Sequence, residues 1–244
     1  MKQTNLTILE NTRLADGIYR LRLAGDTSAI TAPGQFVNLK LSGFFLRRPI
    51  SVCDWENGKL TLIYKVLGHG TEAMTGMASG TELNVLTGLG NGFDVSRGGE
   101  HPLLVGGGVG IPPLYGLAKR LTAQGKRVTA VLGFNRKSEI FLAEEFRALG
   151  AEVVIATADG SAGIHGLVTD GMAAVSDYTY LYTCGPEPML KAVYDACKTS
   201  GQFSFEERMG CGFGACMGCS CETKYGNKRI CKDGPVLEKE EIVW

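Results

Sequence analysis

Residues 103–121 read LLVGGGVGIPPLYGLAKRL, a short apolar run followed by a glycine-rich turn and a segment of different periodicity. Apolar residues in that last segment occupy the i, i+3, i+4 and i+7 positions of one helix face, namely Leu114, Leu117, Ala118 and Leu121. A buried strand that passes through a tight turn into a helix is the repeating unit of a parallel α/β sheet. The stretch therefore predicts where such a domain begins.

The same alternation of strand and helix continues downstream. Strand-like apolar runs occupy 128–133, 153–156 and 180–184, with one helical pattern centred on Phe146 and another after the last strand. Strands that alternate with helices indicate a parallel sheet covered by helices. A polar, glycine-rich stretch before the first strand is typical of a linker, so we expect the α/β domain to span 98–200.

In the residues before this domain, apolar side chains recur with a shorter period. Apolar residues occupy every second position at 37–41 and again at 60–66, with turn-forming residues between such runs. This alternation is typical of half-buried antiparallel strands, and several of them at short spacing predict a small barrel. The predicted fold is therefore β + α/β: an N-terminal antiparallel β-barrel at 1–97, the parallel α/β domain, and a small C-terminal subdomain at 201–244. In that last region the regular pattern gives way to cysteines.

Five of the eight cysteines lie between residues 211 and 231. Cys211, Cys216 and Cys219 follow the spacing C-x4-C-x2-C, and Cys231 comes eleven intervening residues later. This is the plant-type ligand pattern of a 2Fe-2S cluster. The loop is rich in glycine, which lets backbone amides turn towards the sulfurs of a compact inorganic core. The spacing therefore predicts a 2Fe-2S cluster held by these four thiolates.

Two other interpretations of the cysteines stay open. Structural zinc prefers paired C-x2-4-C knuckles, and only Cys216 and Cys219 form one here. Cys221 is a further candidate ligand, although it lies close to Cys219 and strand alternation would direct it away. The fourth cysteine also follows sooner than in plant-type ferredoxins, so the fold around the cluster is expected to differ.

Charge and hydropathy exclude several classes of protein. Lys and Arg number 25, as do Asp and Glu, so the formal net charge is zero. This balance argues against a nucleic-acid partner and against electrostatic binding to a membrane surface. The N-terminal residues have no apolar signal core, and no run of 18 apolar residues occurs. With the cysteines gathered in one region, these features predict a protein of a reducing compartment, the cytoplasm.

Two segments of the barrel region are candidates for binding an extended anionic ligand. In the run Arg48-Pro49-Ile50-Ser51, a cation and a hydroxyl stand three residues apart, although an Arg-Pro turn at a strand end is common. The second segment, 63–71, is a strand that enters a glycine-flanked turn. Its Gly70 and Thr71 amides and the threonine hydroxyl are suited to phosphate.

Two loops of the α/β region are candidates for binding a nucleotide. The glycines of 106–110 lie between a strand and a helix start, where a pyrophosphate can approach the backbone. The strict G-x-G-x-x-G pattern fails because position 111 is Ile and position 113 is Pro. The run Thr183-Cys184-Gly185-Pro186 ends the last predicted strand, at the edge where parallel sheets bind ligands.

Taken together, RPIS at 48–51, GGGVGIPP at 106–113 and TCGPEPM at 183–189 resemble the ferredoxin-NADP reductase superfamily. The usual flavin motif there is Arg-x-Tyr-Ser, and Ile50 replaces the tyrosine, which leaves Tyr64 as a candidate for the aromatic contact. The cysteine-rich run 204–221 narrows the resemblance to the electron-transfer subunits of NAD-dependent (type B) dihydroorotate dehydrogenases. The resemblance covers essentially the whole chain.

The resemblance implies a cofactor for each region. The barrel would bind FAD through Arg48, Pro49, Ile50, Ser51, Ile63, Tyr64, Lys65, Gly70 and Thr71. The α/β domain would receive NAD at Gly106, Gly107, Gly108, Gly110, Cys184, Gly185 and Pro186, with Cys184 near the nicotinamide. The cluster ligands would be Cys211, Cys216, Cys219 and Cys231. No residue is assigned a certain catalytic role.

The resemblance also implies a partner and a reaction. An iron–sulfur cluster carries one electron at a time and nicotinamide accepts a hydride, so a flavin must stand between them. The implied path runs from dihydroorotate to the FMN of a separate catalytic subunit, then to 2Fe-2S, FAD and NAD. The chain would thus be an oxidoreductase component in pyrimidine (UMP) biosynthesis, in a heterotetramer with two copies of each subunit.

Three other functions stay open at this point. The first is an NAD(P)H-dependent reductase component that serves a ferredoxin or an oxygenase. The second is a subunit of an electron-bifurcating reductase, and the third is a zinc-stabilised nucleotide sensor. NADP is a further alternative to NAD, because Asn135-Arg136-Lys137 after the second α/β strand could hold a 2′-phosphate. NAD is chosen from the resemblance.

Overall fold

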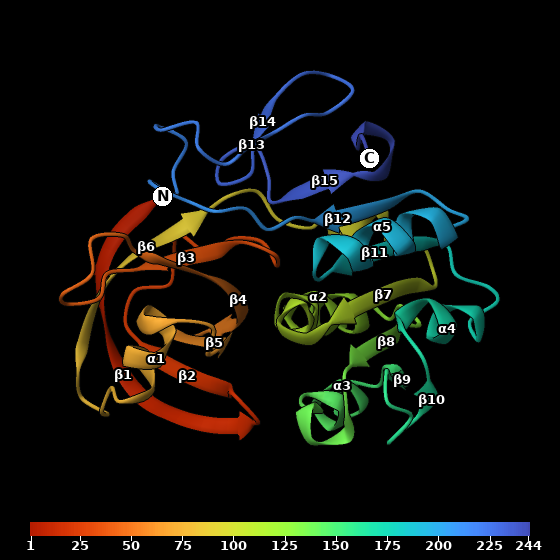
Figure 1. The fold of residues 1–244 in the computed structure, drawn as a ribbon, viewed down its shortest axis with the longest axis horizontal. Coiled ribbons are helices and arrows are strands. Elements are labelled where there is room, and N and C mark those ends of the chain that lie inside the picture. The colour runs from red at the N-terminus through yellow and green to blue at the C-terminus, as the bar shows by residue number, and fades with distance from the viewer.

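The computed structural model describes all residues from 1 to 244. Figure 1 shows a β-barrel beside a helix-covered sheet. The cysteine-rich segment, residues 201–244, lies across the top of both. This arrangement confirms the predicted fold class. No helix is long and apolar enough to cross a membrane.

Six antiparallel strands close the barrel in the order β1-β2-β5-β4-β3-β6. Its strands are β1 (Lys2–Ala15), β2 (Ile18–Ala24), β3 (Phe36–Leu39), β4 (Arg48–Glu56), β5 (Lys59–Lys65) and β6 (Glu82–Leu89). One short helix, α1 (His69–Thr75), follows β5. Alternate residues such as Val37, Leu39, Leu60 and Leu62 are buried inside the barrel, as the period-two pattern predicts.

The second body is a seven-stranded sheet in the order β10-β9-β8-β7-β11-β12-β15. All neighbouring strands are parallel except the edge pair β12 and β15. The strands are β7 (Pro102–Gly107), β8 (Thr129–Phe134), β9 (Glu152–Thr157), β10 (Ile164–His165), β11 (Tyr180–Cys184), β12 (Gly201–Ser204) and β15 (Val236–Glu238). The helices are α2 (Ile111–Ala123), α3 (Ala143–Ala148), α4 (Val168–Ala173) and α5 (Glu187–Ala196), with 3-10 turns η1 (Val95–Gly98), η2 (Gly108–Gly110), η3 (Lys137–Glu139) and η4 (Lys239–Glu241).

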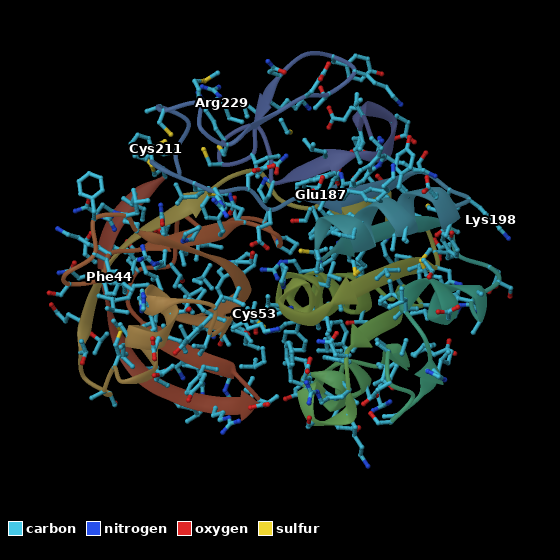
Figure 2. The ribbon with its side chains drawn as sticks, in the orientation of Figure 1. Phe44, Cys53, Glu187, Lys198, Cys211 and Arg229 are labelled. Carbon is cyan, nitrogen blue, oxygen red and sulfur yellow. The ribbon has the colours of Figure 1, made fainter.

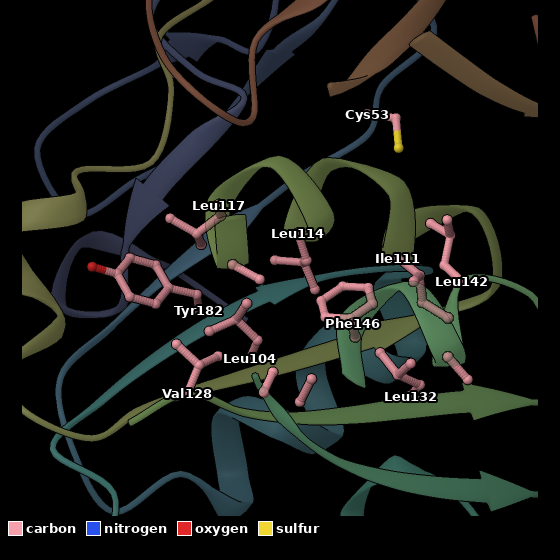
Figure 3. Close-up of a cluster of buried hydrophobic side chains, with 14 of the residues drawn as sticks. Cys53, Leu104, Ile111, Leu114, Leu117, Val128, Leu132, Leu142, Phe146 and Tyr182 are labelled. Atoms are coloured by element: carbon pink, nitrogen blue, oxygen red, sulfur yellow. The ribbon is translucent and has the colours of Figure 1, made fainter. Parts of the chain in front are cut away.

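The core of the sheet domain continues into the barrel. Figure 3 shows Leu114 and Leu117 of α2 facing Leu104 and Phe146, with Cys53 of the barrel above the helix. A β-carbon on Gly116 of α2 would lie 2.6 Å from the Cys53 carbonyl oxygen, so helix and strand are in backbone contact there. The bare glycine is what lets the two domains pack this closely.

Polar contacts flank this apolar interface. The Arg120 guanidinium lies 3.6 Å from the centroid of the Trp55 ring, a cation–π contact between α2 and β4. Lys119 beside it donates to Asp54 at 2.9 Å and to Glu56 at 2.8 Å. The barrel and the sheet are therefore fixed relative to one another along α2.

The region after residue 200 contains regular structure that its sequence pattern does not reveal. Strands β12 and β15 extend the central sheet, and β13 (Ser220–Cys221) pairs with β14 (Lys228–Arg229) beside it. Ile230 and Leu237 are buried in the same cluster as Leu103 and Leu181 of the central strands. The domain boundaries at 98 and 201 stay predictions, because the cysteine-rich region shares its core with the sheet.

Candidate functional site

The four predicted cluster ligands come together as two pairs of thiols. The Cys216 amide donates to the Cys211 sulfur at 3.5 Å, and the Cys231 amide donates to the Cys219 sulfur at 3.4 Å. The second pair is buried, whereas Cys216 is exposed. No group of three or more His, Cys, Asp or Glu side chains is placed to hold one metal ion. Two pairs of thiolates are the ligand set that a binuclear cluster needs, because each of its irons takes two.

Backbone amides surround the first ligand. The Cys211 sulfur accepts hydrogen bonds from the amides of Phe213 at 3.5 Å, Ala215 at 3.2 Å and Cys216 at 3.5 Å. Burial raises the pKa of this thiol, but these bonds outweigh it and the pKa falls to about 6. Gly212 and Gly214 make the turn possible, with φ values of 77° and 92°. The loop is therefore built to hold a thiolate, the form that binds iron.

Cys221 stands apart from these pairs. It lies on β13 opposite Lys228, half-buried against the core of the cysteine-rich segment. Burial raises the pKa of its thiol, and negative charge on Glu207 and Cys219 raises it further. The exclusion of Cys221 from the four ligands stays a prediction.

Sequence reasoning missed Arg229, which holds the cluster loop in place (Figure 2). Its Nη1 donates to the Gly214 carbonyl at 2.9 Å, while Nε and Nη2 donate to the two carboxylate oxygens of Asp233 at 2.9 and 3.2 Å. This two-point ion pair fixes the guanidinium, which in turn fixes the loop between the first two ligands. The sequence does carry a signal for this contact. Arg229 lies two residues before Cys231, and Asp233 follows the arginine at the i+4 position.

The two predicted flavin segments of the barrel meet at Arg48 and Gly70. A β-carbon on Gly70 would lie 2.0 Å from the Arg48 Nε, so the guanidinium lies directly on the glycine backbone. The turn itself is held by Thr71, whose hydroxyl oxygen accepts hydrogen bonds from the amides of Leu67 at 2.9 Å and Gly68 at 3.3 Å. A cation and a glycine turn on adjacent elements are a suitable cradle for a pyrophosphate.

The side chains of Ile63 and Tyr64 are occupied by packing. Tyr64 is buried inside the barrel, where its ring stacks on Tyr19 and its hydroxyl donates to the Asn11 side chain at 3.2 Å. Burial raises its pKa to about 12. Ile63 is buried on the opposite face, in the core shared with α2. The expectation that Tyr64 supplies an aromatic face for the flavin conflicts with this burial, so a contact of Tyr64 with the flavin would be made by its backbone.

The two predicted nucleotide loops lie against one another at the ends of β7 and β11. These strands are adjacent and parallel, with Gly106 opposite Cys184. A β-carbon on Gly107 or on Gly185 would meet the sulfur of Met189, at 2.5 and 2.7 Å. Burial raises the pKa of the Cys184 thiol to about 12, so it is protonated at neutral pH. The loops form one glycine-lined surface at the carboxyl edge of the sheet, where α/β folds bind nucleotides.

The arginine of the basic run after β8 is paired with a neighbouring carboxylate. Glu139 accepts from Asn135 at 2.8 Å and forms an ion pair with Arg136 at 3.0 Å. A carboxylate in this position repels a 2′-phosphate and competes for the arginine that would bind it. The geometry therefore favours NAD over NADP.

Comparison with known proteins identifies the family. The model of the iron-sulfur cluster binding domain of dihydroorotate dehydrogenase B matches residues 206–243, and that of the oxidoreductase NAD-binding domain matches 104–195. The Shouchella clausii dihydroorotate dehydrogenase B (NAD(+)) electron transfer subunit is 44% identical over 256 residues, covering 99% of this chain and 98% of the relative. The subunit of the same name from Geobacillus sp. (strain WCH70) is 45% identical, covering 100% and 99%.

The chain belongs to the family of dihydroorotate dehydrogenase B electron transfer subunits. It is an NAD-binding, iron–sulfur oxidoreductase component with an electron-transfer role in pyrimidine biosynthesis, as the sequence predicts. The family name also indicates a separate catalytic subunit.

Solved structures agree with this family. A structure described as an NADH-dependent reduced ferredoxin-NADP oxidoreductase, reported for flavin-based electron bifurcation, matches with a TM-score of 0.90 and 29% identity. The match covers 98% of this chain and 90% of that one. A Neisseria gonorrhoeae ferredoxin NADP+ reductase with bound FAD and NADP has a TM-score of 0.70 at 18% identity, covering 80% and 90%. At that identity the likeness shows the fold alone.

Proposed function

We propose that this dihydroorotate dehydrogenase B electron transfer subunit carries electrons from the FMN of a catalytic partner, through 2Fe-2S and FAD, to NAD. The partner would convert dihydroorotate to orotate. The observation that carries the proposal is the arrangement of the three sites. The Arg48–Ser51 strand pairs with β3, whose Asn38 contacts Cys211, and it packs on α2, the helix that follows the first nucleotide loop.

Each predicted site residue has a role in this proposal. Cys211, Cys216, Cys219 and Cys231 would hold the cluster, and the amides around Cys211 would stabilise its charge. Arg48 and the turn at Gly70 and Thr71 would hold the FAD pyrophosphate. Pro49, Ile50, Ser51, Ile63, Tyr64 and Lys65 would contact the flavin, with Ile63 and Tyr64 acting through the backbone. Gly106, Gly107, Gly108, Gly110, Cys184, Gly185 and Pro186 would receive NAD.

The flavin, when bound, would convert single electrons into the hydride that NAD accepts. The chain's own contribution is to position groups. Arg229 keeps the ligand loop in shape, Arg48 supplies positive charge, and the packing of α2 on β4 keeps the nucleotide loops at a constant place relative to the barrel. Fixed geometry suits electron transfer, because neither domain needs to reorient between steps.

The proposal also covers the cofactor of the partner, the number of subunits and the cellular compartment. The catalytic partner would carry FMN, and two copies of each subunit would form a heterotetramer. All eight cysteines are free thiols, which is consistent with a reducing, cytoplasmic compartment.

The test is to purify the chain alone and together with a type B catalytic subunit. The chain alone is expected to contain FAD and two irons and to oxidise NADH with a dye as acceptor, without acting on dihydroorotate. The complex is expected to reduce NAD with dihydroorotate. A stable complex that contains all cofactors and fails to couple these two substrates contradicts the proposal.

A second candidate is a subunit of an electron-bifurcating ferredoxin reductase, favoured by the TM-score of 0.90 to such a structure. The identity of 29% to that protein is well below the 44% to the dihydroorotate dehydrogenase subunits. NADH-dependent reduction of ferredoxin by the chain with its native partner, without turnover of dihydroorotate, would favour this alternative.

A further inference from the structure

Two adjacent phenylalanines lie in the loop 40–47, which leads from β3 to the predicted flavin strand β4. Their surroundings differ although their side chains are the same. Phe45 is fully exposed, whereas Phe44 is half-buried and packs against the core of the barrel (Figure 2). The contacts of Phe44 therefore set it apart from its neighbour, and they involve the first residue of β4.

The Phe44 ring contacts the guanidinium of Arg48. The central carbon of the guanidinium lies 4.8 Å from the ring centroid, which is a cation–π contact. The same side chain donates from Nη1 to the Leu46 carbonyl, and a β-carbon on Gly70 would lie 2.6 Å from its central carbon. The ring, the carbonyl and the glycine backbone thus restrict a side chain that is otherwise rich in rotamers.

The positive charge of Arg48 is not compensated by a carboxylate. None of the ion pairs in the structure includes this residue. Its Nη1 makes both of its hydrogen bonds, so Nε and Nη2 donate to no acceptor, and neither of these two atoms is fully buried. Two neighbouring donors on one guanidinium suit two oxygens of a phosphate group. Arg48 is therefore a restricted, accessible cation with its paired donors available to an anion.

Resting on the proposed function, we propose that Phe44 is a positioning residue of the FAD site. Its ring holds the Arg48 guanidinium at Gly70, so that Nε and Nη2 stay available to the FAD pyrophosphate. Phe44 needs no contact with the cofactor, because it acts by reducing the freedom that Arg48 loses when it binds an anion. The ring should therefore affect FAD binding only where the arginine is present.

The test measures FAD release from the purified, cofactor-loaded chain, followed by the rise of flavin fluorescence after dilution. Phe44→Leu keeps an apolar side chain and removes the ring. It is expected to release FAD about fivefold faster, as for the loss of one partly exposed cation–π contact. Phe45→Leu is the matched control and should release FAD at the wild-type rate, because that ring is fully exposed. Equal rates in Phe44→Leu and wild type overturn the proposal.

A double-mutant cycle with Arg48→Gln separates positioning of the arginine from packing of the loop. Arg48→Gln, loaded with excess FAD, is expected to release the cofactor at least tenfold faster, because a charged hydrogen bond is lost. Adding Phe44→Leu to this variant should change the rate no further, since the ring then has no cation to hold. A fivefold acceleration in both backgrounds would show that Phe44 supports only the loop, and it would overturn the positioning role.

Phe44→Tyr provides the conservative rescue, because it keeps the ring and should release FAD at the wild-type rate. Release as fast as that of Phe44→Leu contradicts the proposal. If the leucine variant fails to fold, Phe44→Met takes its place in the cycle, since methionine fills irregular space without a ring. Wild-type protein that retains no FAD contradicts the proposed function instead. Wild-type protein that retains FAD, with no effect of the ring, contradicts only the role of Phe44, so the two failures are distinguishable.

Discussion

The backbone of Gly110 lies against the carbonyl oxygen of Cys184, so that a β-carbon on Gly110 would stand 2.2 Å from that oxygen. Two loops more than 70 residues apart in the sequence are thereby joined into one surface at the carboxyl edge of the sheet. The contact requires glycine for space, since Gly110 has an ordinary helical φ of −79°.

Gly110→Ala is expected to impair NADH oxidation, because the added methyl group forces the two loops apart. Overpacking at a backbone contact costs about 1–3 kcal/mol, which corresponds to a loss of roughly tenfold or more in kcat/KM for NADH with a dye acceptor. FAD content should stay at the wild-type value. Gly76→Ala is the control, because a β-carbon there meets nothing closer than 3.9 Å. Equal kcat/KM values in Gly110→Ala and wild type would refute the assignment of these loops.

Arg229→Ala is expected to weaken retention of the cluster. The substitution removes the bond to the Gly214 carbonyl and leaves the Asp233 carboxylate without its partner. Charge-assisted bonds of this kind contribute about 1.5–3 kcal/mol, so cluster loss under chelator should accelerate by roughly tenfold or more. Arg147→Ala, which breaks only an exposed pair with Glu144, serves as the control. If both variants lose iron at the same rate, Arg229 does not hold the loop.

The cysteine substitutions should divide into two classes. Cys219→Ser removes a predicted ligand and is expected to abolish the 2Fe-2S absorbance, whereas Cys221→Ser is expected to keep it. FAD binding and NADH oxidation with a dye should survive in both, because neither the Arg48–Gly70 cradle nor the nucleotide loops contain these cysteines. Iron content and EPR spectra provide the measurement. Loss of the cluster in Cys221→Ser would reassign the ligand set.

Glu139→Gln is expected to shift the nucleotide preference towards NADPH. The substitution removes the carboxylate that engages Arg136 and Asn135 and leaves the arginine free for a 2′-phosphate. The ratio of kcat/KM for NADH to that for NADPH should fall by about fivefold, the effect of one partly exposed charge. Glu144→Gln is a control of equal charge change on an exposed helix. The same ratio in both variants would show that this loop does not meet the nucleotide.

The barrel contains an ion pair whose contribution depends on pH. Hydrogen bonds from Arg20 and Thr12 bring the pKa of Glu10 down to about 2. Because the folded-state pKa lies below the ordinary value of 4.5, the carboxylate stabilises the fold above about pH 4.5, and this stabilisation is lost as the pH falls towards 2. Glu10→Gln should therefore lower the midpoint of thermal unfolding by about 1–3 °C at pH 7.

Thermal melts followed by circular dichroism at pH 7 and pH 3 test this expectation. The difference between Glu10→Gln and wild type should shrink at the lower pH. Glu82→Gln, an exposed glutamate on β6, controls for the general effect of removing one negative charge. A difference that is constant with pH would assign the effect to packing instead of to the ion pair.

Local patterns in the sequence determined the elements and most of the candidate residues. Alternation at 37–41 and 60–66 located barrel strands, and the helical spacing after Gly110 located α2, because the burial of one face imposes the period of each element. The spacing of the four cysteines indicated the cluster, since thiolates that wrap a small core must lie close in the chain.

Only the tertiary structure decided which distant residues meet. The alternation that marked Tyr64 as a strand residue does not reveal that its ring faces the barrel interior, since a one-residue change of register would reverse it. The short strands β12 and β15 carry too few residues for a period to emerge, yet they extend the sheet. The contact of Asn38 with Cys211 spans 173 positions, and it follows from how the barrel and the cysteine-rich segment pack, which no local pattern encodes.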